Sequence, residues 1–185
     1  MSRVLSYASI DLDFRNYLGL PLQKGCNKMN IQTKYLGNID IEEAKVIRFP
    51  AGLPGFIDET KFVLLDLPGN EAFQILQSVT SEHIAFIVTN PYHFYHEYEF
   101  ELEANVLESL SINSEEDVII LTIVTLKDPF HTSTMNLKAP IILNSAEMRG
   151  KQYILNISDY SAKAPLSRSP VGKEPLHAST HEKTK

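Results

Sequence analysis

The sequence feature that most constrains the fold is a corner at residues 49–56, which read Phe-Pro-Ala-Gly-Leu-Pro-Gly-Phe. Proline fixes φ and removes a backbone donor, whereas glycine reaches positive φ without steric cost. In residues 53–56, proline and glycine hold the two central positions of a type II turn, which predicts a positive φ at Gly55. Apolar runs at residues 45–49 and 62–65 flank the corner, so we expect the chain to leave one strand there and enter another. The residues expected to build the corner are Phe49, Pro50, Gly52, Pro54, Gly55 and Phe56.

Between residues 29 and 160 apolar and polar residues alternate with a period of two, which is typical of strands. Residues 118–124 are β-branched and almost wholly apolar, and indicate a central strand covered on both faces. One short helix is expected at Ala104–Leu110. Many short strands with close turns favour an all-β fold with minor α content, a single β-barrel-like domain of short antiparallel strands. Strands are expected at residues 30–36, 39–49, 61–67, 72–79, 84–89, 94–103, 118–126, 132–138, 140–144 and 151–157.

The two ends of the chain lack this pattern. Residues 1–28 show no clear period, so we expect either a disordered extension or a segment upstream of a natural start at Met29. Residues 161–185 are rich in Ser, Pro, Lys, His and Thr, a composition that buries too little apolar surface to offset the entropy of ordering. A flexible tail is therefore expected beyond about Leu166, which leaves residues 29–160 as the folded domain.

The charge of the chain is unevenly distributed. The net charge is −6, but residues 29–160 hold 8 of the 17 Lys and Arg residues and 19 of the 23 Asp and Glu residues, a net charge of −11 for that segment. Such a body repels nucleic-acid phosphates and attracts basic partners, which argues against direct binding to RNA or DNA. No apolar stretch approaches the roughly 20 residues of a membrane span, and no secretory signal is recognised. A cytoplasmic protein is expected, and a single Cys26 allows no internal disulfide.

An uninterrupted alternation of acidic and apolar residues at positions 97–103 is the strongest functional signal from the residues alone. In a strand, Tyr98, Phe100 and Leu102 would face the core while the four glutamates face solvent. This row is either a solvated strand face or a docking surface for a basic protein, where charge raises the association rate and selects partners. A calcium site is disfavoured because no calcium-loop motif is present. The candidate partner-binding residues are Glu97, Glu99, Glu101 and Glu103, with Tyr95 as an outward aromatic at their rim or as ordinary strand-end packing.

The sequence offers no constellation for catalysis, a cofactor or a metal. His93 and His96 would point to opposite faces of an extended segment, and no H-E-x-x-H motif occurs. The nucleophile-elbow, P-loop and dinucleotide-binding motifs are likewise missing from the sequence. We therefore expect a protein that is not an enzyme. The alternative is a barrel that binds a flavin or another small ligand, although no phosphate-binding motif favours it.

Residues 29–166 resemble the family of flagellar assembly factors named FliW. The resemblance rests on residues 31–37, 47–56, 62–65, 73–79, 90–91, 98–100, 136–144, 150–152 and 160–161. It implies a non-enzymatic cytoplasmic regulator with a β-barrel-like fold that acts in flagellum biogenesis. Such proteins bind the RNA-binding repressor CsrA, which relieves repression of flagellin translation, and they also bind flagellin as a chaperone would. Exchange between the two partners would couple the flagellin level to its own synthesis.

The resemblance transfers no residue-level contacts. On charge, we assign the row of glutamates with Tyr95 as the surface that binds CsrA. The corner at residues 49–56 is a weaker candidate for a binding surface, because it is expected to hold the barrel together. No face is assigned to flagellin.

Overall fold

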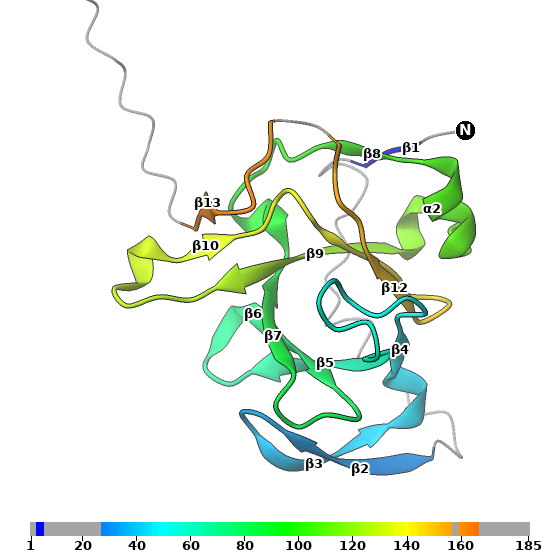
Figure 1. Cartoon of the computed structure of the whole chain (residues 1–185), viewed down its shortest axis with the longest axis vertical. Coiled ribbons are helices and arrows are strands. Elements are labelled where there is room, and N and C mark those ends of the chain that lie inside the picture. The colour runs from blue at the N-terminus through cyan, green and yellow to red at the C-terminus, as the bar shows by residue number, and fades with distance from the viewer. Residues whose placement is uncertain (1–2, 6–26, 157–158, 167–185) are drawn as a thin grey trace, which may run out of the picture.

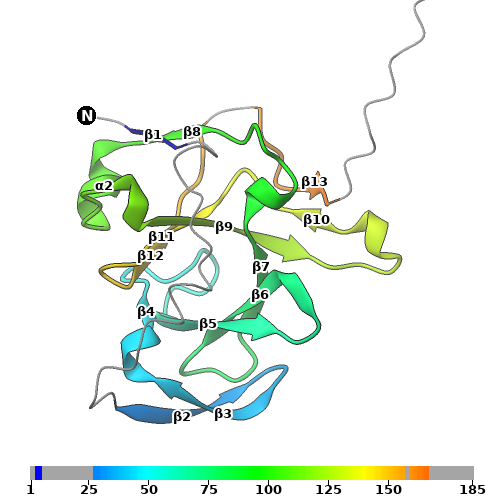
Figure 2. The same cartoon turned by 180° about the vertical axis from the view of Figure 1, so that it is seen from behind.

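The protein is built almost entirely of strands, as the sequence predicts (Figures 1 and 2). The computed structural model describes residues 3–5, 27–156 and 159–166, and these contain one α-helix, α2 (Ala104–Ser109). The strands are β1 (Arg3–Leu5), β2 (Lys28–Thr33), β3 (Gly37–Glu42), β4 (Ile47–Arg48), β5 (Lys61–Leu67), β6 (Asn70–Ser78), β7 (Ala85–Thr89), β8 (Phe100–Leu102), β9 (Val118–Thr125), β10 (Thr134–Met135), β11 (Ile141–Asn144), β12 (Arg149–Gln152) and β13 (Ala164–Pro165). Short 3-10 turns lie at Glu43–Lys45, Pro91–His93, Glu115–Asp117 and Phe130–Thr132.

The pairing of the main sheet closes into a barrel. Its order is β11-β12-β4-β5-β6-β7-β9-β10-β13, and an additional pairing joins β11 to β9. Strand β9 therefore contacts β7 through Thr122–Val124 and β11 through Val118–Leu121, which completes the ring. All of these pairs are antiparallel except β12 with β4, which pair in parallel at Arg149 and Arg48. The all-β, barrel-like prediction is confirmed, with this one parallel exception to the expected antiparallel pairing.

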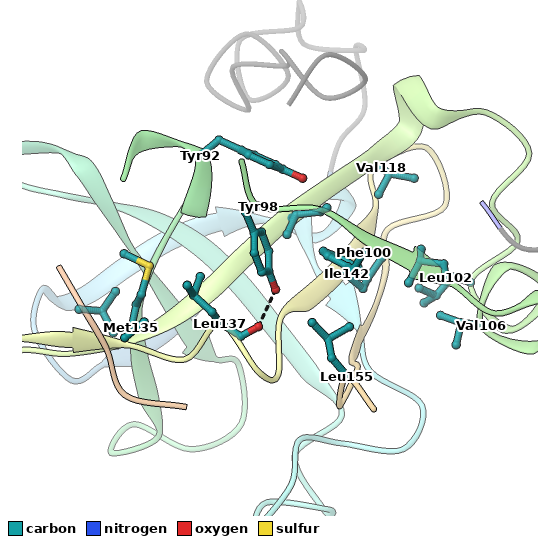
Figure 3. Close-up of a cluster of buried hydrophobic side chains, with 14 of the residues drawn as sticks. Tyr92, Tyr98, Phe100, Leu102, Val106, Val118, Met135, Leu137, Ile142 and Leu155 are labelled. Atoms are coloured by element: carbon teal, nitrogen blue, oxygen red, sulfur yellow. Dashed lines mark hydrogen bonds between the residues drawn. The ribbon is translucent and has the colours of Figure 1, made fainter. Parts of the chain in front are cut away.

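Strand β9 divides the interior into two apolar clusters, as its near-continuous apolar sequence predicts. Alternate side chains point to opposite faces of a strand, so Ile119 and Leu121 enter one cluster while Val118, Ile120 and Val124 enter the other. The first cluster fills the barrel between β4, β5, β6 and β11. The second lies beneath β8 and α2 and includes Tyr98, Phe100 and Leu102 (Figure 3).

A buried amide ties the β2–β3 hairpin to the barrel. Gln77 on β6 is fully buried, and its Oε1 accepts a hydrogen bond of 3.0 Å from the Lys34 N–H in the β2–β3 turn. Its Nε2 lies within hydrogen-bond distance of four carbonyl oxygens, those of Ser78, Ser81, Glu82 and Ile84. Ile31, Ile41 and Val63 form a third, smaller apolar cluster on the same side. One side chain thus fixes the position of two hairpins.

The corner at residues 49–56 has the predicted geometry. The Phe56 N–H donates to the Leu53 carbonyl at 2.7 Å, and Gly55 has a φ of 85°. A second turn precedes it, closed by the Gly52 N–H on the Phe49 carbonyl at 2.8 Å, with a φ of 63° at Gly52. Phe49 is fully buried, and its ring meets that of Phe62 edge-on at 5.2 Å. The corner connects β4 to β5, as expected.

Several expected strands are shorter than the alternation suggested. The segment 39–49 is interrupted by the 3-10 turn at Glu43–Lys45, and the segment 132–138 keeps only β10 as a strand. Of the expected strand 151–157, the described residues 151–156 contribute only the end of β12. The segment 94–103 keeps only β8, because the N–H groups of Phe94 and Tyr95 donate to the Pro91 carbonyl and the Tyr98 N–H donates to the Tyr95 carbonyl, which makes turns of the residues before the strand. The alternation of apolar and polar residues predicts which side chains are buried, whereas local hydrogen bonds determine where the pairing between strands ends.

The two chain ends hold short strands that the sequence did not indicate. Arg3–Leu5 form β1, which pairs antiparallel with β8, although residues 1–28 were expected to stay outside the fold. Ala164–Pro165 form β13 on β10, inside the segment that was expected to begin the flexible tail. The expectations for residues 1–2, 6–26 and 167–185 lie outside the described residues.

Candidate functional site

The four glutamates at positions 97, 99, 101 and 103, the acidic ladder, are all exposed. The residues between them are buried: Tyr98 at 1% exposure, Phe100 at 4% and Leu102 at 0%. The predicted division of this segment into a core side and a solvent side is therefore confirmed. This alternation anchors the segment through its apolar residues and leaves its carboxylates in water, where repulsion between neighbours about 7 Å apart is well under 1 kcal/mol per pair after screening.

Tyrosines hold the part of the ladder that precedes β8. The Tyr98 hydroxyl donates to the Leu137 carbonyl at 2.7 Å, and burial raises the pKa of Tyr98 far above its ordinary value (Figure 3). The Tyr160 ring packs edge-on against the Tyr98 ring at 4.6 Å. Its hydroxyl accepts from the Glu99 N–H and lies within hydrogen-bond distance of the Glu99 carbonyl, both at 2.9 Å. In the part of the expected strand 94–103 that precedes β8, these tyrosine contacts take the place of strand pairing.

The ladder borders an open hollow of about 490 Å³. Its lining residues are Glu99, Phe100, Glu101, Glu103, Tyr153, Leu155 and Asn156. The Tyr153 hydroxyl donates to Glu103 Oε1 at 3.1 Å, and burial together with this hydrogen bond raises the pKa of Tyr153. Glu103 Oε2 also accepts from Asn105 at 3.3 Å. Glu103 is thus partly engaged within the molecule, which makes Glu97, Glu99 and Glu101 the more accessible carboxylates for a partner.

Tyr95 lies at the edge of this face but is half-buried. It packs against the apolar cluster beneath β8, and its hydroxyl donates to the Pro165 carbonyl of β13 at 2.7 Å. Its contacts match the packing alternative given above. Its role as an interface anchor stays a prediction.

A second exposed feature lies on the 49–56 corner, the weaker candidate. Phe56 is 38% exposed and packs edge-on against Phe86 at 5.3 Å, and Ile57 beside it is 71% exposed. Glu59 then fixes the exit of the corner by accepting hydrogen bonds from the hydroxyls of Ser78, Thr80 and Ser81. These hydrogen bonds hold the pKa of Glu59 below its ordinary value. The corner is both a structural joint and a small apolar surface.

Two classes of feature are missing from the part of the chain that the structure describes. In residues 3–5, 27–156 and 159–166, no group of three or more His, Cys, Asp or Glu side chains is arranged to hold a metal ion. None of the helices in those ranges combines the length and apolar character that crossing a bilayer requires.

Sequence reasoning missed the tyrosines that complete the acidic face. Tyr153 lies 50 residues beyond Glu103 and Tyr160 lies 61 residues beyond Glu99, and only the fold brings them to the ladder. It also missed Arg3–Leu5, because three residues are too few to show a period.

Comparison with known proteins agrees with the resemblance of the sequence. The model of the family described as FliW protein matches residues 30–166. A flagellar assembly factor FliW of Oceanobacillus iheyensis is 50% identical over 143 residues, which are 77% of this chain and 97% of that protein. The factor of the same name from Bacillus subtilis is 46% identical over 138 residues, 75% of this chain and 96% of its own length. A crystal structure of the flagellar assembly factor FliW superposes with a TM-score of 0.73 at 42% identity, and covers 77% of this chain and all of that one.

Proposed function

Because the chain belongs to the FliW family of flagellar assembly factors, we propose that it acts in flagellum biogenesis as a cytoplasmic protein that binds other proteins. Its proposed partners are the translational repressor CsrA, whose repression of flagellin synthesis it relieves, and flagellin itself. The family match covers residues 30–166, which contain every strand of the main sheet.

The observation that supports a binding role most directly is the acidic ladder. Four exposed carboxylates follow one another on a segment whose alternate residues are fixed in the core. A positively charged partner would be steered to such a face over a distance set by the Debye length, about 8 Å at physiological salt. We assign CsrA to this face on charge, and leave flagellin without an assigned surface.

The proposal is tested by measuring the association of the purified chain with CsrA at several salt concentrations. The triple variant Glu97→Lys, Glu99→Lys, Glu101→Lys is expected to associate at least tenfold more slowly at low salt, and to lose most of the salt dependence of the rate. Glu103 is kept, because its hydrogen bonds to Tyr153 and Asn105 give it a structural role.

A matched control separates the local surface from net charge. Asp58, Glu82 and Glu147 are exposed and lie outside the ladder, so replacing all three with lysine changes the net charge by the same amount. If both triple variants slow the association with CsrA equally, the ladder is not the binding surface and only the net charge of the protein matters.

The flavin-binding alternative gives a different outcome in the same preparation. The hollow beside β8 is lined by three glutamates, which would repel the phosphate of a flavin nucleotide. We therefore expect colourless protein that retains CsrA or flagellin from a cell lysate. A yellow preparation that retains neither protein would overturn the proposal.

A further inference from the structure

β8 contains Glu101 of the acidic ladder, lies between Glu99 and Glu103, and has an unusual neighbour. Within the described residues, β8 pairs with no strand other than β1, and the two form a sheet of their own apart from the barrel. Arg3 lies opposite Leu102, Val4 opposite Glu101, and Leu5 opposite Phe100. The chain therefore places its own first residues along one edge of the candidate docking strand (Figures 1 and 2).

β8 is held in place by contacts that do not involve β1. Phe100 and Leu102 are buried in the apolar cluster, Tyr160 binds the backbone of Glu99 just before the strand, and α2 follows it. A strand fixed in this way presents a preformed row of N–H and C=O groups along its edge. Such an edge is a template onto which another extended chain can add.

The residues that occupy this edge lie outside the body shared with relatives. The family model begins at residue 30, and a FliW of a Geobacillus strain aligns over its entire length with only 145 residues of this chain. The crystal structure of a FliW likewise covers 77% of this chain and all of its own. β1 thus lies outside residues 30–166, which the family model matches and which contain every strand of the main sheet.

We propose that the β1-facing edge of β8 is an acceptor site for an extended, basic peptide segment of a partner protein, and that Arg3–Leu5 is its resident occupant. The segment is a strand of only three residues, and pairing of that length exchanges readily. It is tethered to β2 by residues 6–27, which keep it at a high effective concentration near the edge. An incoming segment must therefore displace the chain's own strand.

Charge defines the chemistry of the partner segment. A strand added to this edge lies beside Glu99, Glu101 and Glu103, so lysine or arginine side chains in it are favoured over acidic ones. In the resident strand Val4 lies opposite Glu101 and Arg3 lies opposite Leu102, so an incoming segment with lysine or arginine opposite Glu101 would gain a charge pair that the resident strand lacks. This inference deepens the proposed function, on whose acidic face it rests.

Disulfide trapping tests the resident pairing in the full chain. In a Cys26→Ser background, Val4→Cys with Glu101→Cys places two thiols on directly opposite residues, which suits a disulfide. We expect this pair to oxidise at least tenfold faster than the control Val4→Cys with Glu108→Cys, whose second site lies on α2. Equal rates would refute the β1–β8 pairing.

Peptide binding tests the acceptor edge. The probe is a fluorescently labelled peptide with the sequence of residues 1–10, measured by anisotropy. Consecutive N–H groups of a strand point to opposite edges, so the double variant Val4→Pro, Leu5→Pro must remove a donor to β8. If the resident segment covers the edge nine-tenths of the time, this variant binds the peptide about tenfold more tightly than the unmodified chain. The matched control is Ser179→Pro with Thr180→Pro, which should bind like the unmodified chain.

The disulfide-locked protein completes the test, because its edge is closed and it should bind no peptide until it is reduced. Equal peptide binding by the locked and double-proline variants would overturn the acceptor site. These readouts use neither CsrA nor flagellin. If the lysine triple variant loses CsrA binding but the peptide never binds, only the acceptor site is refuted. If the peptide binds but the lysine triple variant still associates normally with CsrA, the acceptor site stands and the assigned function is refuted.

Discussion

Two glycines of the 49–56 corner have nearly the same backbone conformation but different surroundings, and this contrast predicts different costs of substitution. Gly52 and Gly55 both have positive φ, at 63° and 85°. A left-handed conformation costs an alanine about 1–2 kcal/mol relative to its preferred region. Among the described residues, a Cβ at Gly55 would meet nothing within 4 Å, so Gly55→Ala should cost about that amount and no more.

Gly52→Ala carries an additional steric cost. Its Cβ would lie 2.5 Å from the carbonyl oxygens of both Phe56 and Ile57, which are backbone atoms and cannot rotate away. The Phe56 carbonyl also accepts hydrogen bonds from the N–H groups of Leu53 and Glu59, each at 3.2 Å. Moving it would weaken both bonds, at about 0.5–1.5 kcal/mol each. Together with the conformational cost, we expect a destabilisation of about 3–4 kcal/mol.

Urea unfolding measures this difference directly. With a denaturant slope of about 2 kcal/mol per molar, Gly52→Ala should lower the midpoint by roughly 1.5–2 M and Gly55→Ala by about 0.5–1 M. Asparagine tolerates positive φ better than alanine, so Gly55→Asn should recover part of the loss while Gly52→Asn should not. Equal midpoints for the two alanine variants, at unchanged slope, would refute the steric argument and the local geometry on which it rests.

Two further substitutions test the side-chain contacts that join the hairpins. Gln77→Ala removes the amide that bonds the Lys34 N–H and faces four carbonyl oxygens, and should lower the free energy of unfolding by about 2–4 kcal/mol, measured by urea unfolding at neutral pH. Glu59→Gln tests the lowered pKa of Glu59: a carboxylate with a lowered folded-state pKa adds stability above its unfolded-state pKa and loses it as pH falls through the folded-state pKa. The variant should therefore be less stable than the unmodified chain at pH 7, and the two should converge as the pH falls below the ordinary glutamate pKa of about 4.3 and through the lower folded-state pKa; a difference that does not change with pH would contradict this assignment.

The sequence predicts most of the fold because the period of two and the turn residues act locally. The 49–56 corner and the central strand at 118–124 follow from proline, glycine and β-branched residues in adjacent positions. The extent of pairing does not follow in the same way. The expected strand at 94–103 is shortened by two successive turns, in which the Tyr95 N–H donates to the Pro91 carbonyl and the Tyr98 N–H donates to the Tyr95 carbonyl, and the alternation of residue types does not reveal them. The parallel contact of β12 with β4 arises from closure of the barrel, which no local pattern encodes.

The candidate site shows the same division between local and long-range information. The alternation at 97–103 is local, and it correctly separates the buried residues from the exposed glutamates. The partners that orient this face, Tyr153 and Tyr160, come from a distant segment and are hydrogen-bonded to Glu103 and to the backbone of Glu99. A sequence can therefore reveal which side chains face solvent before it reveals what surrounds them.

The arrangement of β8 separates stability from recognition within a single segment. Tyr98, Phe100 and Leu102 supply the anchoring, because each is almost wholly buried and Tyr98 also binds the Leu137 carbonyl. The intervening glutamates contribute little to folding, since exposed charges of one sign at this spacing neither gain nor lose much in water. Their charge can thus change without loss of the fold. Pairing along the edge of β8 uses backbone atoms and therefore does not require the glutamate side chains either. A lysine substitution at Glu97, Glu99 or Glu101 is accordingly a test of binding, because a folded protein with altered association is the outcome that this division of roles requires.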